Sequence, residues 1–134
     1  MQSIVVDCSA FLACTLLDEA PPANLLEALA AARFVVPAIW PTEVGNAFLT
    51  ALKKGRMDDM ALRAVIASLN ERELEIEAAG LELALSDALA LARKFKLTVY
   101  DASYLELALR RNFPLATLDA DLIKAARKAG AKVA

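Results

Sequence analysis

The 134-residue chain contains no histidine. This absence excludes the Ser-His-Asp and Cys-His arrangements that activate a nucleophile. It also excludes zinc sites that depend on histidine and nucleases that use two histidines as acid and base. The two cysteines are too few for a four-cysteine zinc site. Any acid–base or metal chemistry must therefore use carboxylates, lysines or tyrosines.

Cysteine is scarce as well. Cys8 and Cys14 lie in an apolar segment at a spacing that matches neither a CxxC motif nor a disulfide framework. We expect both to be buried free thiols in a reducing cytosol. No run approaches the roughly 18 uncharged apolar residues of a membrane span. The first residues also carry no basic leader of the signal-peptide kind. Together these features predict a cytoplasmic protein.

The sequence is rich in alanine and leucine, and hydrophobic side chains make up 58% of it. We expect one domain spanning residues 1–134, with a single hydrophobic core. The net charge of −2 is unevenly distributed, because residues 1–90 hold 6 basic and 13 acidic side chains and residues 91–134 hold 9 basic and 4 acidic ones. The basic part, which includes Arg110 and Arg111, either faces a polyanion or consists of solvated helix faces and helix C-terminal charges.

Short β-like runs alternate along the chain with longer helical patterns. Strands are expected at residues 2–6, 34–36, 74–77, 115–118 and 131–134. Helices are expected at residues 9–17, 22–32, 41–54, 58–69, 81–95, 101–111 and 119–129. The acidic alternation at 71–77 predicts a solvated strand face. The whole pattern predicts an α/β fold, a three-layer α/β/α architecture with a central, mainly parallel sheet.

Four carboxylates each follow an apolar run of this pattern. They are Asp7 after residues 3–6, Glu43 after residues 34–37, Asp101 after residues 97–100 and Asp119 after residues 115–118. The carboxyl ends of parallel strands lie at one edge of a sheet, where ligands bind. Acids gathered there would form an anionic pocket that a divalent metal neutralises. The pattern therefore indicates metal-assisted phosphodiester chemistry.

Each acid also has a purely structural explanation. Asp101 and Asp119 are suitable helix N-caps, which stabilise a helix by about 1 kcal/mol. Asp7 would cap the next helix in the same way. Glu43 would interact with the dipole of the helix that it opens. Gathering all four would cost free energy through repulsion, and a protein selected only for stability gains nothing from it. The sequence leaves both explanations open.

Five short motifs carry a family resemblance along the whole chain. They are Ile4-Val5-Val6-Asp7-Cys8-Ser9, Val36-Pro37, Glu43-Val44-Gly45-Asn46-Ala47, Val99-Tyr100-Asp101-Ala102-Ser103-Tyr104 and Leu115-Ala116-Thr117-Leu118-Asp119. Each motif is weak alone, but their order and spacing are specific. The chain resembles PIN-domain ribonucleases, and in particular the VapC-type toxin of VapBC toxin–antitoxin pairs. The resemblance implies a single PIN-like domain over residues 1–134.

The resemblance also implies a site and its ligands. The catalytic, metal-binding carboxylates would be Asp7, Glu43, Asp101 and Asp119, with Asp7 and Asp101 as direct ligands of Mg²⁺ or Mn²⁺. Ser9 and Thr117 would support them through hydroxyl groups, Asn46 would have a polar role, and Asp121 is either a fifth acid or a first-turn helix acid. We expect Tyr104 to lie in the core or an interface.

The reaction and partners implied by the resemblance are equally specific. The substrate would be RNA, cleaved to leave a 5′-phosphate and a 3′-hydroxyl. A cognate antitoxin protein and a homodimer would use the apolar faces around residues 11–30 and 61–91, and an antitoxin arginine would replace the metal among the carboxylates.

Two other readings come from different functional classes. A receiver-like signalling domain also gathers acids around Mg²⁺, but it needs paired acids after its first strand and a lysine after its last. Here Asp7 is single and position 9 is Ser9, which also counts against the Asp-x-Asp motif of a phosphatase. A non-catalytic PIN-like module that binds RNA or protein is the second alternative.

Overall fold

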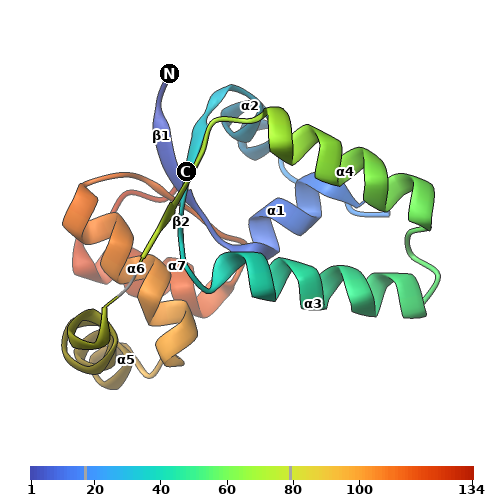
Figure 1. Cartoon of the computed structure of the whole chain (residues 1–134). Coiled ribbons are helices and arrows are strands. Elements are labelled where there is room, and N and C mark those ends of the chain that lie inside the picture. Colours follow the sequence, from blue (N-terminus) through green and yellow to red (C-terminus); the bar gives the residue numbers. More distant parts are fainter. Residues whose placement is uncertain (17, 79) are drawn as a thin grey trace.

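The computed structural model describes residues 1–16, 18–78 and 80–134. Within these residues a sheet of parallel strands has the order β3-β2-β1-β4 (Figure 1). The strands are β1 Ser3–Val6, β2 Arg33–Pro37, β3 Leu74–Glu77 and β4 Leu115–Ala116. The central strands β1 and β2 are mostly apolar because helices cover both of their faces.

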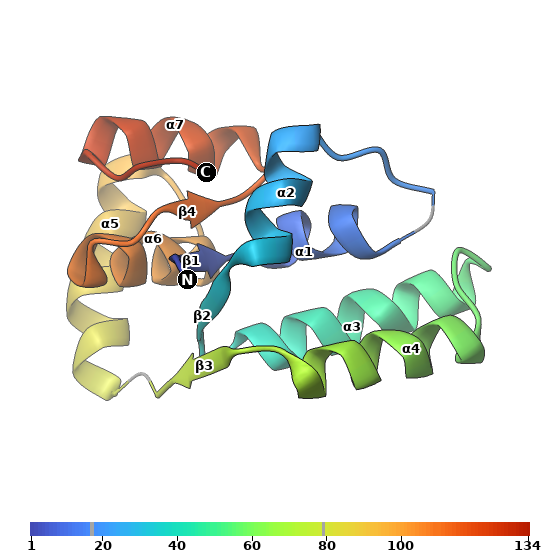
Figure 2. The same cartoon turned by 90° about the horizontal axis from the view of Figure 1, so that it is seen from above.

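Helices form a layer on each side of this sheet (Figure 2). On one side lie α1 Cys8–Thr15, α2 Ala23–Ala31, α3 Trp40–Lys53 and α4 Asp59–Glu71. On the other side lie the π-helix η1 Leu83–Ala88, α5 Leu89–Phe95 and α6 Val99–Arg111, with α7 Ala120–Ala129 beside α6. The predicted three-layer α/β/α architecture is confirmed. In the described part of the chain, the helices lack the length and apolar character needed to cross a membrane.

The core fixes the central strands from both sides. On the α1 side, the Phe11 ring lies 5.2 Å from that of Trp40 and 6.2 Å from those of Phe34 and Phe48, centroid to centroid. Edge-on contacts between aromatic rings are favourable beyond the area they bury. On the α6 side, Tyr104 and Leu105 are fully buried. The segments that leave the carboxyl ends of β1 and β2 therefore start from rigid positions.

Several predicted boundaries differ from the structure. The strand expected at 115–118 is only Leu115–Ala116, and the one expected at 131–134 is a single bridge between Leu115 and Val133. The helix expected at 9–17 ends at Thr15, and Leu17 lies outside the described residues. The helix expected at 81–95 is present, and part of it is the π-helix η1, which precedes α5.

The prediction that Asp101 is an N-cap is wrong. Helix α6 begins at Val99, and its N-cap is Thr98, whose Oγ1 accepts a hydrogen bond of 3.1 Å from the Asp101 backbone N–H. The apolar run before Asp101 is therefore a loop and the first helical residues, not a strand. Threonine is a good N-cap because its side-chain oxygen satisfies an otherwise unpaired N–H of the first turn. Asp101 thus reaches its position from the first turn of a helix.

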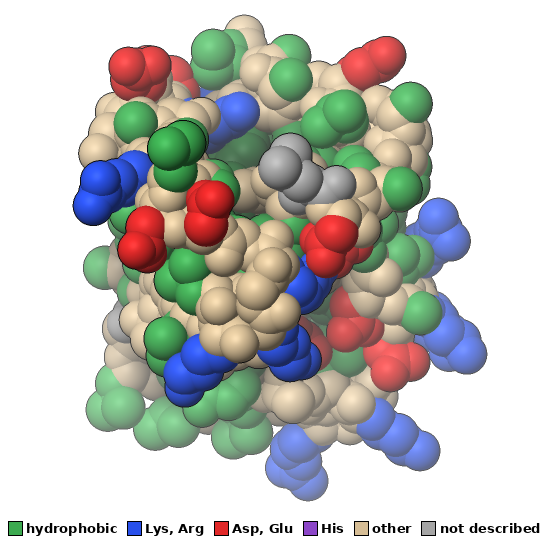
Figure 3. Space-filling model, turned by 90° about the vertical axis from the view of Figure 1, so that its right-hand side faces the viewer, with side chains coloured by type: hydrophobic (Ala, Val, Ile, Leu, Met, Phe, Trp, Pro, Cys, Tyr) green, Lys and Arg blue, Asp and Glu red, His purple; other side chains and the backbone are tan. Residues whose placement is uncertain are grey.

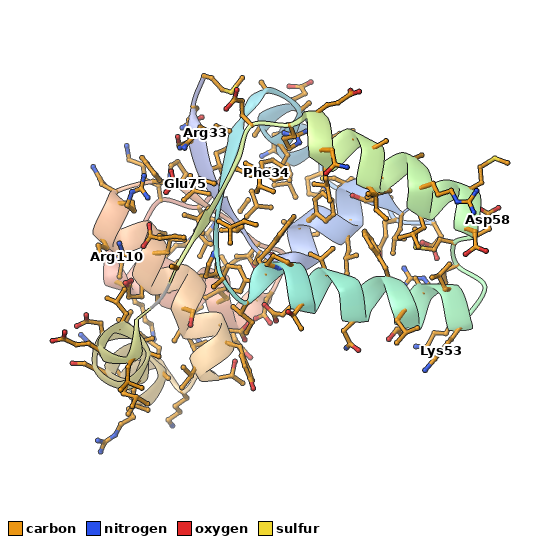
Figure 4. The ribbon with its side chains drawn as sticks, viewed as in Figure 1. Arg33, Phe34, Lys53, Asp58, Glu75 and Arg110 are labelled. Carbon is orange, nitrogen blue, oxygen red and sulfur yellow. The ribbon has the colours of Figure 1, made fainter. Side chains whose placement is uncertain are left out.

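The edge strand β3 is tied to its neighbours by ion pairs. Glu75 accepts 2.6 Å hydrogen bonds from Arg33 of β2 and from Arg111 of α6. Glu77 pairs with Arg111 at 2.7 Å and with Arg110. Figure 4 shows Arg33 beside Glu75, with Arg110 on the neighbouring helix. The solvated face predicted for residues 71–77 is therefore, at these two glutamates, an ion-paired one.

Candidate functional site

Asp7 lies at the carboxyl end of β1 and is only 5% exposed. Its Oδ1 accepts hydrogen bonds from the Ala10 backbone N–H at 2.9 Å and from the Ser9 hydroxyl at 2.7 Å. Its Oδ2 accepts a hydrogen bond from the Thr117 hydroxyl. The first of these contacts makes Asp7 the N-cap of α1, as its position after the strand predicted.

Ser9 and Thr117 join the first strand to the last. Their hydroxyl oxygens lie 3.4 Å apart. Ser9 Oγ also accepts a 3.0 Å hydrogen bond from the Leu118 N–H, and Thr117 Oγ1 accepts one of 3.1 Å from the Asp119 N–H. The two hydroxyl groups therefore hold Asp7 and the backbone that leads to Asp119 in one hydrogen-bonded network.

Asp119 follows β4 and caps α7, where its Oδ1 accepts a 3.0 Å hydrogen bond from the Leu122 N–H. Asp121 lies in the first turn of the same helix and is exposed. Both acids thus have the helix-stabilising positions that the structural explanation assigned to them. A cap contact uses one carboxylate oxygen and leaves the other free for a second partner.

Glu43 lies in the first turn of α3 and accepts a hydrogen bond from the Tyr104 hydroxyl of α6. Tyr104 is 1% exposed, so its prediction as a core residue was incomplete: the ring is core, but the hydroxyl positions a candidate acid. Burial raises the pKa of Tyr104 and the bond to Glu43 raises it further, so the hydroxyl remains a donor. A buried tyrosine hydroxyl needs a polar partner, so the prediction that Tyr104 is buried already indicated a contact with a polar side chain.

Burial and neighbouring negative charge raise the pKa values of three of the acids. Burial is the largest cause that raises the pKa values of Asp7, Glu43 and Asp101. The charge of Asp101 raises the pKa of Asp7 further, and the charges of Asp101 and Asp7 raise that of Glu43. Asp119 and Asp121 act in the same way on Asp101. Hydrogen bonds from Thr117, Ala10 and Ser9 to Asp7, from Tyr104 to Glu43 and from Thr98 to Asp101 only partly offset these rises.

These donors suit a hard divalent cation, which prefers carboxylate oxygens. Among residues 1–16, 18–78 and 80–134, however, no group of three His, Cys, Asp or Glu side chains could hold one ion together. Both oxygens of Asp7 also already accept hydrogen bonds. The arrangement therefore suits an ion held by one or two carboxylates and several waters, as Mg²⁺ usually is, rather than direct coordination by four acids.

The other two polar residues near the acids contribute differently. Asn46 is exposed on α3, and no side-chain hydrogen bond of Asn46 joins it to the described acids; only its backbone carbonyl accepts one, from Thr50. Burial, followed by the charges of Glu43 and Asp7, raises the pKa of the Cys8 thiol to about 12. Cys8 is therefore a protonated thiol and not a nucleophile.

The family pattern described as PIN domain matches residues 4–128. The chain belongs to the PIN domain family. PIN domains are generally metal-dependent nucleases that bind RNA, and the family generally uses divalent metal ions. The predicted membership of this family is therefore confirmed. The four candidate acids of this PIN domain all lie within the matched residues.

Solved structures resemble this PIN domain over almost its whole length. The crystal structure of PAE2754 from Pyrobaculum aerophilum is 26% identical, with a TM-score of 0.70, covering 98% of this chain and 83% of that one. A PilT N-terminus domain protein, SSO1118, from Sulfolobus solfataricus P2 is 18% identical, with a TM-score of 0.53 and coverage of 99% and 86%. The second likeness shows the fold alone. No curated protein matches the chain.

Proposed function

We propose that this PIN domain is a Mg²⁺- or Mn²⁺-dependent endoribonuclease, and that it is the VapC-type toxin of a type II toxin–antitoxin pair, with residues 1–134 acting as one domain. The observation that carries the nuclease proposal is that Asp7, Glu43 and Asp101 are buried or partly buried acids whose pKa values are raised, by burial first and then by a neighbouring carboxylate. These carboxylates have no arginine or lysine partner among the described residues. A cation brought by solvent would neutralise them.

Each acid has a role in this proposal. A bound divalent ion would supply Lewis acidity at the phosphate oxygens of the scissile RNA bond. Asp7 and Asp101 would hold that ion, and Glu43 and Asp119 would complete the site directly or through water. Asp121 is the candidate fifth acid.

Glu43 is the best candidate for general base. Its raised pKa brings it closer to neutrality, where a base is most effective, and Tyr104 fixes one of its oxygens. Glu43 would accept the proton of the attacking water. In-line attack would then leave a 5′-phosphate and a 3′-hydroxyl. Ser9 and Thr117 would hold Asp7 in place through the hydrogen bonds that their hydroxyl groups donate to its carboxylate.

The toxin proposal rests on apolar surface as well as on the site. A pocket of about 330 Å³ lies between α1, α2 and α4, lined by Phe11, Leu26, Leu29, Val65 and Leu69 among others. Figure 3 shows the end of the molecule where α3 and α4 meet, with hydrophobic side chains exposed among charged ones. On the other helical layer, Leu81 and Leu85 are 78% and 63% exposed. An antitoxin segment would occupy the first surface, and a second copy of the chain the other.

The test of the nuclease is metal-dependent cleavage of RNA. The wild-type protein should cleave with Mn²⁺ or Mg²⁺ and stop when EDTA is added. Asp101→Asn should abolish cleavage, whereas Asp59→Asn should not, because Asp59 is also a first-turn helix acid but lies on α4, away from the candidate site. Binding of RNA without cleavage under all metal conditions would instead favour the non-catalytic PIN-like module. Membership of the PIN family counts against the receiver-like alternative.

The test of the toxin role is inhibition by a partner. A protein encoded beside this one should bind it and suppress cleavage, and substituting the arginine that it places among the carboxylates should restore activity. A partner that binds without reducing cleavage would contradict the antitoxin proposal and leave the nuclease proposal intact.

A further inference from the structure

The basic residues of the C-terminal part of the chain fall into two groups. Arg110 and Arg111 are paired with glutamates of β3 and α6. Four lysines from two helices behave differently and line one pocket of about 440 Å³. Lys94 and Lys96 come from the end of α5, and Lys124 and Lys128 from α7. Within the described part of the chain, none of these four lysines forms an ion pair.

Local structure places these lysines together. Helix α5 ends at Lys96, which adopts a left-handed conformation with φ of 56° and turns the chain towards α6. Lys124 and Lys128 are four residues apart on α7, so they lie on one face of that helix. Like charges at this spacing repel one another. The pocket therefore gathers positive charge at a cost that a bound anion would offset.

The pocket adjoins the candidate acids. Asp121 lines it together with the lysines, and the charge of Asp121 also acts on the carboxyl group of Asp101. Figure 1 and Figure 2 show α5 and α7 next to α6, the helix that carries Asp101 in its first turn. An extended polyanion could therefore lie over the acid site and the lysines at once.

The pocket also contains an aromatic side chain. Phe95 lines it and is partly buried, and the Lys94 Nζ lies 5.4 Å from the centre of its ring. A positively charged groove combined with an aromatic ring is the arrangement that binds single-stranded nucleic acid, because unpaired bases stack on the ring while the backbone follows the charge. An acidic peptide would use the lysines but would have no base to stack on Phe95.

We infer that the lysine pocket binds two neighbouring backbone phosphates of single-stranded RNA, which flank the phosphate at the acid site. The choice of RNA rests on the proposed function. Lys124 and Lys128 supply the charge from α7, Lys94 and Lys96 supply it from α5, and Phe95 stacks with a neighbouring base. The pocket thus sets the path of the strand, and the acids act on a bond farther along it.

The experiment measures binding without cleavage. A fluorescein-labelled single-stranded oligoribonucleotide is titrated with protein in EDTA, and its anisotropy is followed at several salt concentrations. The variant Lys124→Gln/Lys128→Gln is compared with Lys53→Gln/Lys54→Gln, which removes the same charge from the far end of α3, where Figure 4 labels Lys53. Glutamine has nearly the helix propensity of lysine, so both variants should fold.

The α7 variant should bind about tenfold more weakly at low salt, and the α3 variant should bind as the wild type does. The plot of log association constant against log salt concentration has a negative slope. Its magnitude should decrease by about 1.4 for the two lost phosphate contacts, since each contributes about 0.7 on a single strand. Lys128→Arg should retain wild-type affinity because it keeps the charge. Should Lys124→Gln/Lys128→Gln fail to fold, Lys128→Gln alone should lower the magnitude of the slope by about 0.7.

Three results would overturn the inference: equal weakening by the two pairs, no weakening by the α7 pair, or displacement of the RNA by polyglutamate as readily as by unlabelled RNA. These failures are separate from failure of the proposed function. A protein that cleaves RNA but binds it independently of the lysines keeps the function and loses the pocket. A protein that binds through the lysines but never cleaves with Mn²⁺ keeps the pocket and loses the function.

Discussion

Two groups of carboxylates differ in their partners. Glu75 and Glu77 of the edge strand β3 are paired with arginines, whereas Asp7, Glu43 and Asp101 have no such partner among the described residues. At the edge strand β3, hydrogen bonds from Arg111 and then Arg33 lower the pKa of Glu75 to about 2. Burial would raise the pKa of Glu77, but its bonds to Arg110 and Arg111 lower it overall. At the carboxyl end of β1 and the starts of α3 and α6, burial and neighbouring negative charge raise the pKa values instead.

The contrast teaches that a cluster of acids is not by itself a site. The β3 glutamates Glu75 and Glu77 are only two positions apart in sequence, yet arginines from β2 and α6 satisfy them. Asp7, Glu43 and Asp101 come from distant segments, and none of them has an arginine or lysine partner among the described residues. Asp7 and Glu43 accept hydrogen bonds only from neutral groups there. The missing countercharge, and not the number of carboxylates, marks the candidate site.

The largest difference between the two groups should appear in activity. Asp7→Asn should lower RNA cleavage by at least about 10²-fold, because a ligand of the metal loses its charge. The melting temperature without metal should hardly change, since asparagine caps a helix as well as aspartate does. Cleavage rates and thermal unfolding in EDTA give the two numbers. A large loss of metal-free stability with activity retained would assign Asp7 a structural role.

Thr117→Val should affect both properties. The substitution removes a buried hydroxyl that donates to Asp7 and accepts from the Asp119 N–H. We expect a loss of about 1–2 kcal/mol in the free energy of unfolding. Cleavage should fall at least about tenfold, as for partners of metal ligands generally. Denaturant unfolding and cleavage assays measure the two effects. Thr50→Val is the matched control, because the Thr50 hydroxyl bonds only to a carbonyl of its own helix.

Glu77→Gln should give the opposite pattern. It weakens the pairs with Arg110 and Arg111, which are partly exposed, so the loss in unfolding free energy should be only about 1 kcal/mol or less. Cleavage under saturating RNA should be unchanged because the β3 glutamates take no part in the candidate site. Denaturant unfolding measures the change in stability, and a cleavage assay on the same sample measures the activity. Loss of activity in this variant would remove the distinction between the two groups.

The smallest effect concerns pH. The raised pKa values of Asp7, Glu43 and Asp101 mean that the folded protein binds more protons than the unfolded one just above the ordinary carboxyl pKa. Metal-free stability should therefore rise as pH is lowered from 7 towards about 5, by roughly 3 °C in melting temperature. The rise should be smaller in Asp101→Asn and unaltered in Glu77→Gln. A melting temperature that falls over this range would contradict the expected sign.

Much of the fold follows from local sequence, whereas the site follows from it only in part. The apolar runs before Asp7 and Glu43 are strands, and the helices after them begin within a few residues of the predicted positions. The run before Asp101 misleads because Val99 and Tyr100 are apolar in sequence but 37% and 62% exposed in the structure. Here the cap formed by Thr98 outweighs the hydrophobic pattern.

The contacts that sequence reasoning missed join distant segments. The bond from Tyr104 to Glu43 spans 61 positions, and no local pattern specifies it. The pairing of Arg110 and Arg111 with β3 is likewise invisible until the edge strand is placed beside α6. The sequence left open whether the basic C-terminal part faces a polyanion or consists of solvated helix faces. Only the structure separates the paired arginines from the lysines around the pocket.

The bond between Asp7 and Thr117 joins residues 110 positions apart, which directly follow β1 and β4, the first and last strands in the chain. During synthesis, Asp7 leaves the ribosome long before the residue that holds its second oxygen. The same applies to Asp119 and to the lysines of α7. A growing chain therefore lacks part of the candidate site, and the cleavage that we propose requires β4 to have paired with β1. If the protein cleaves RNA as we propose, its order of synthesis keeps the unfinished chain from cleaving RNA while it is still on the ribosome.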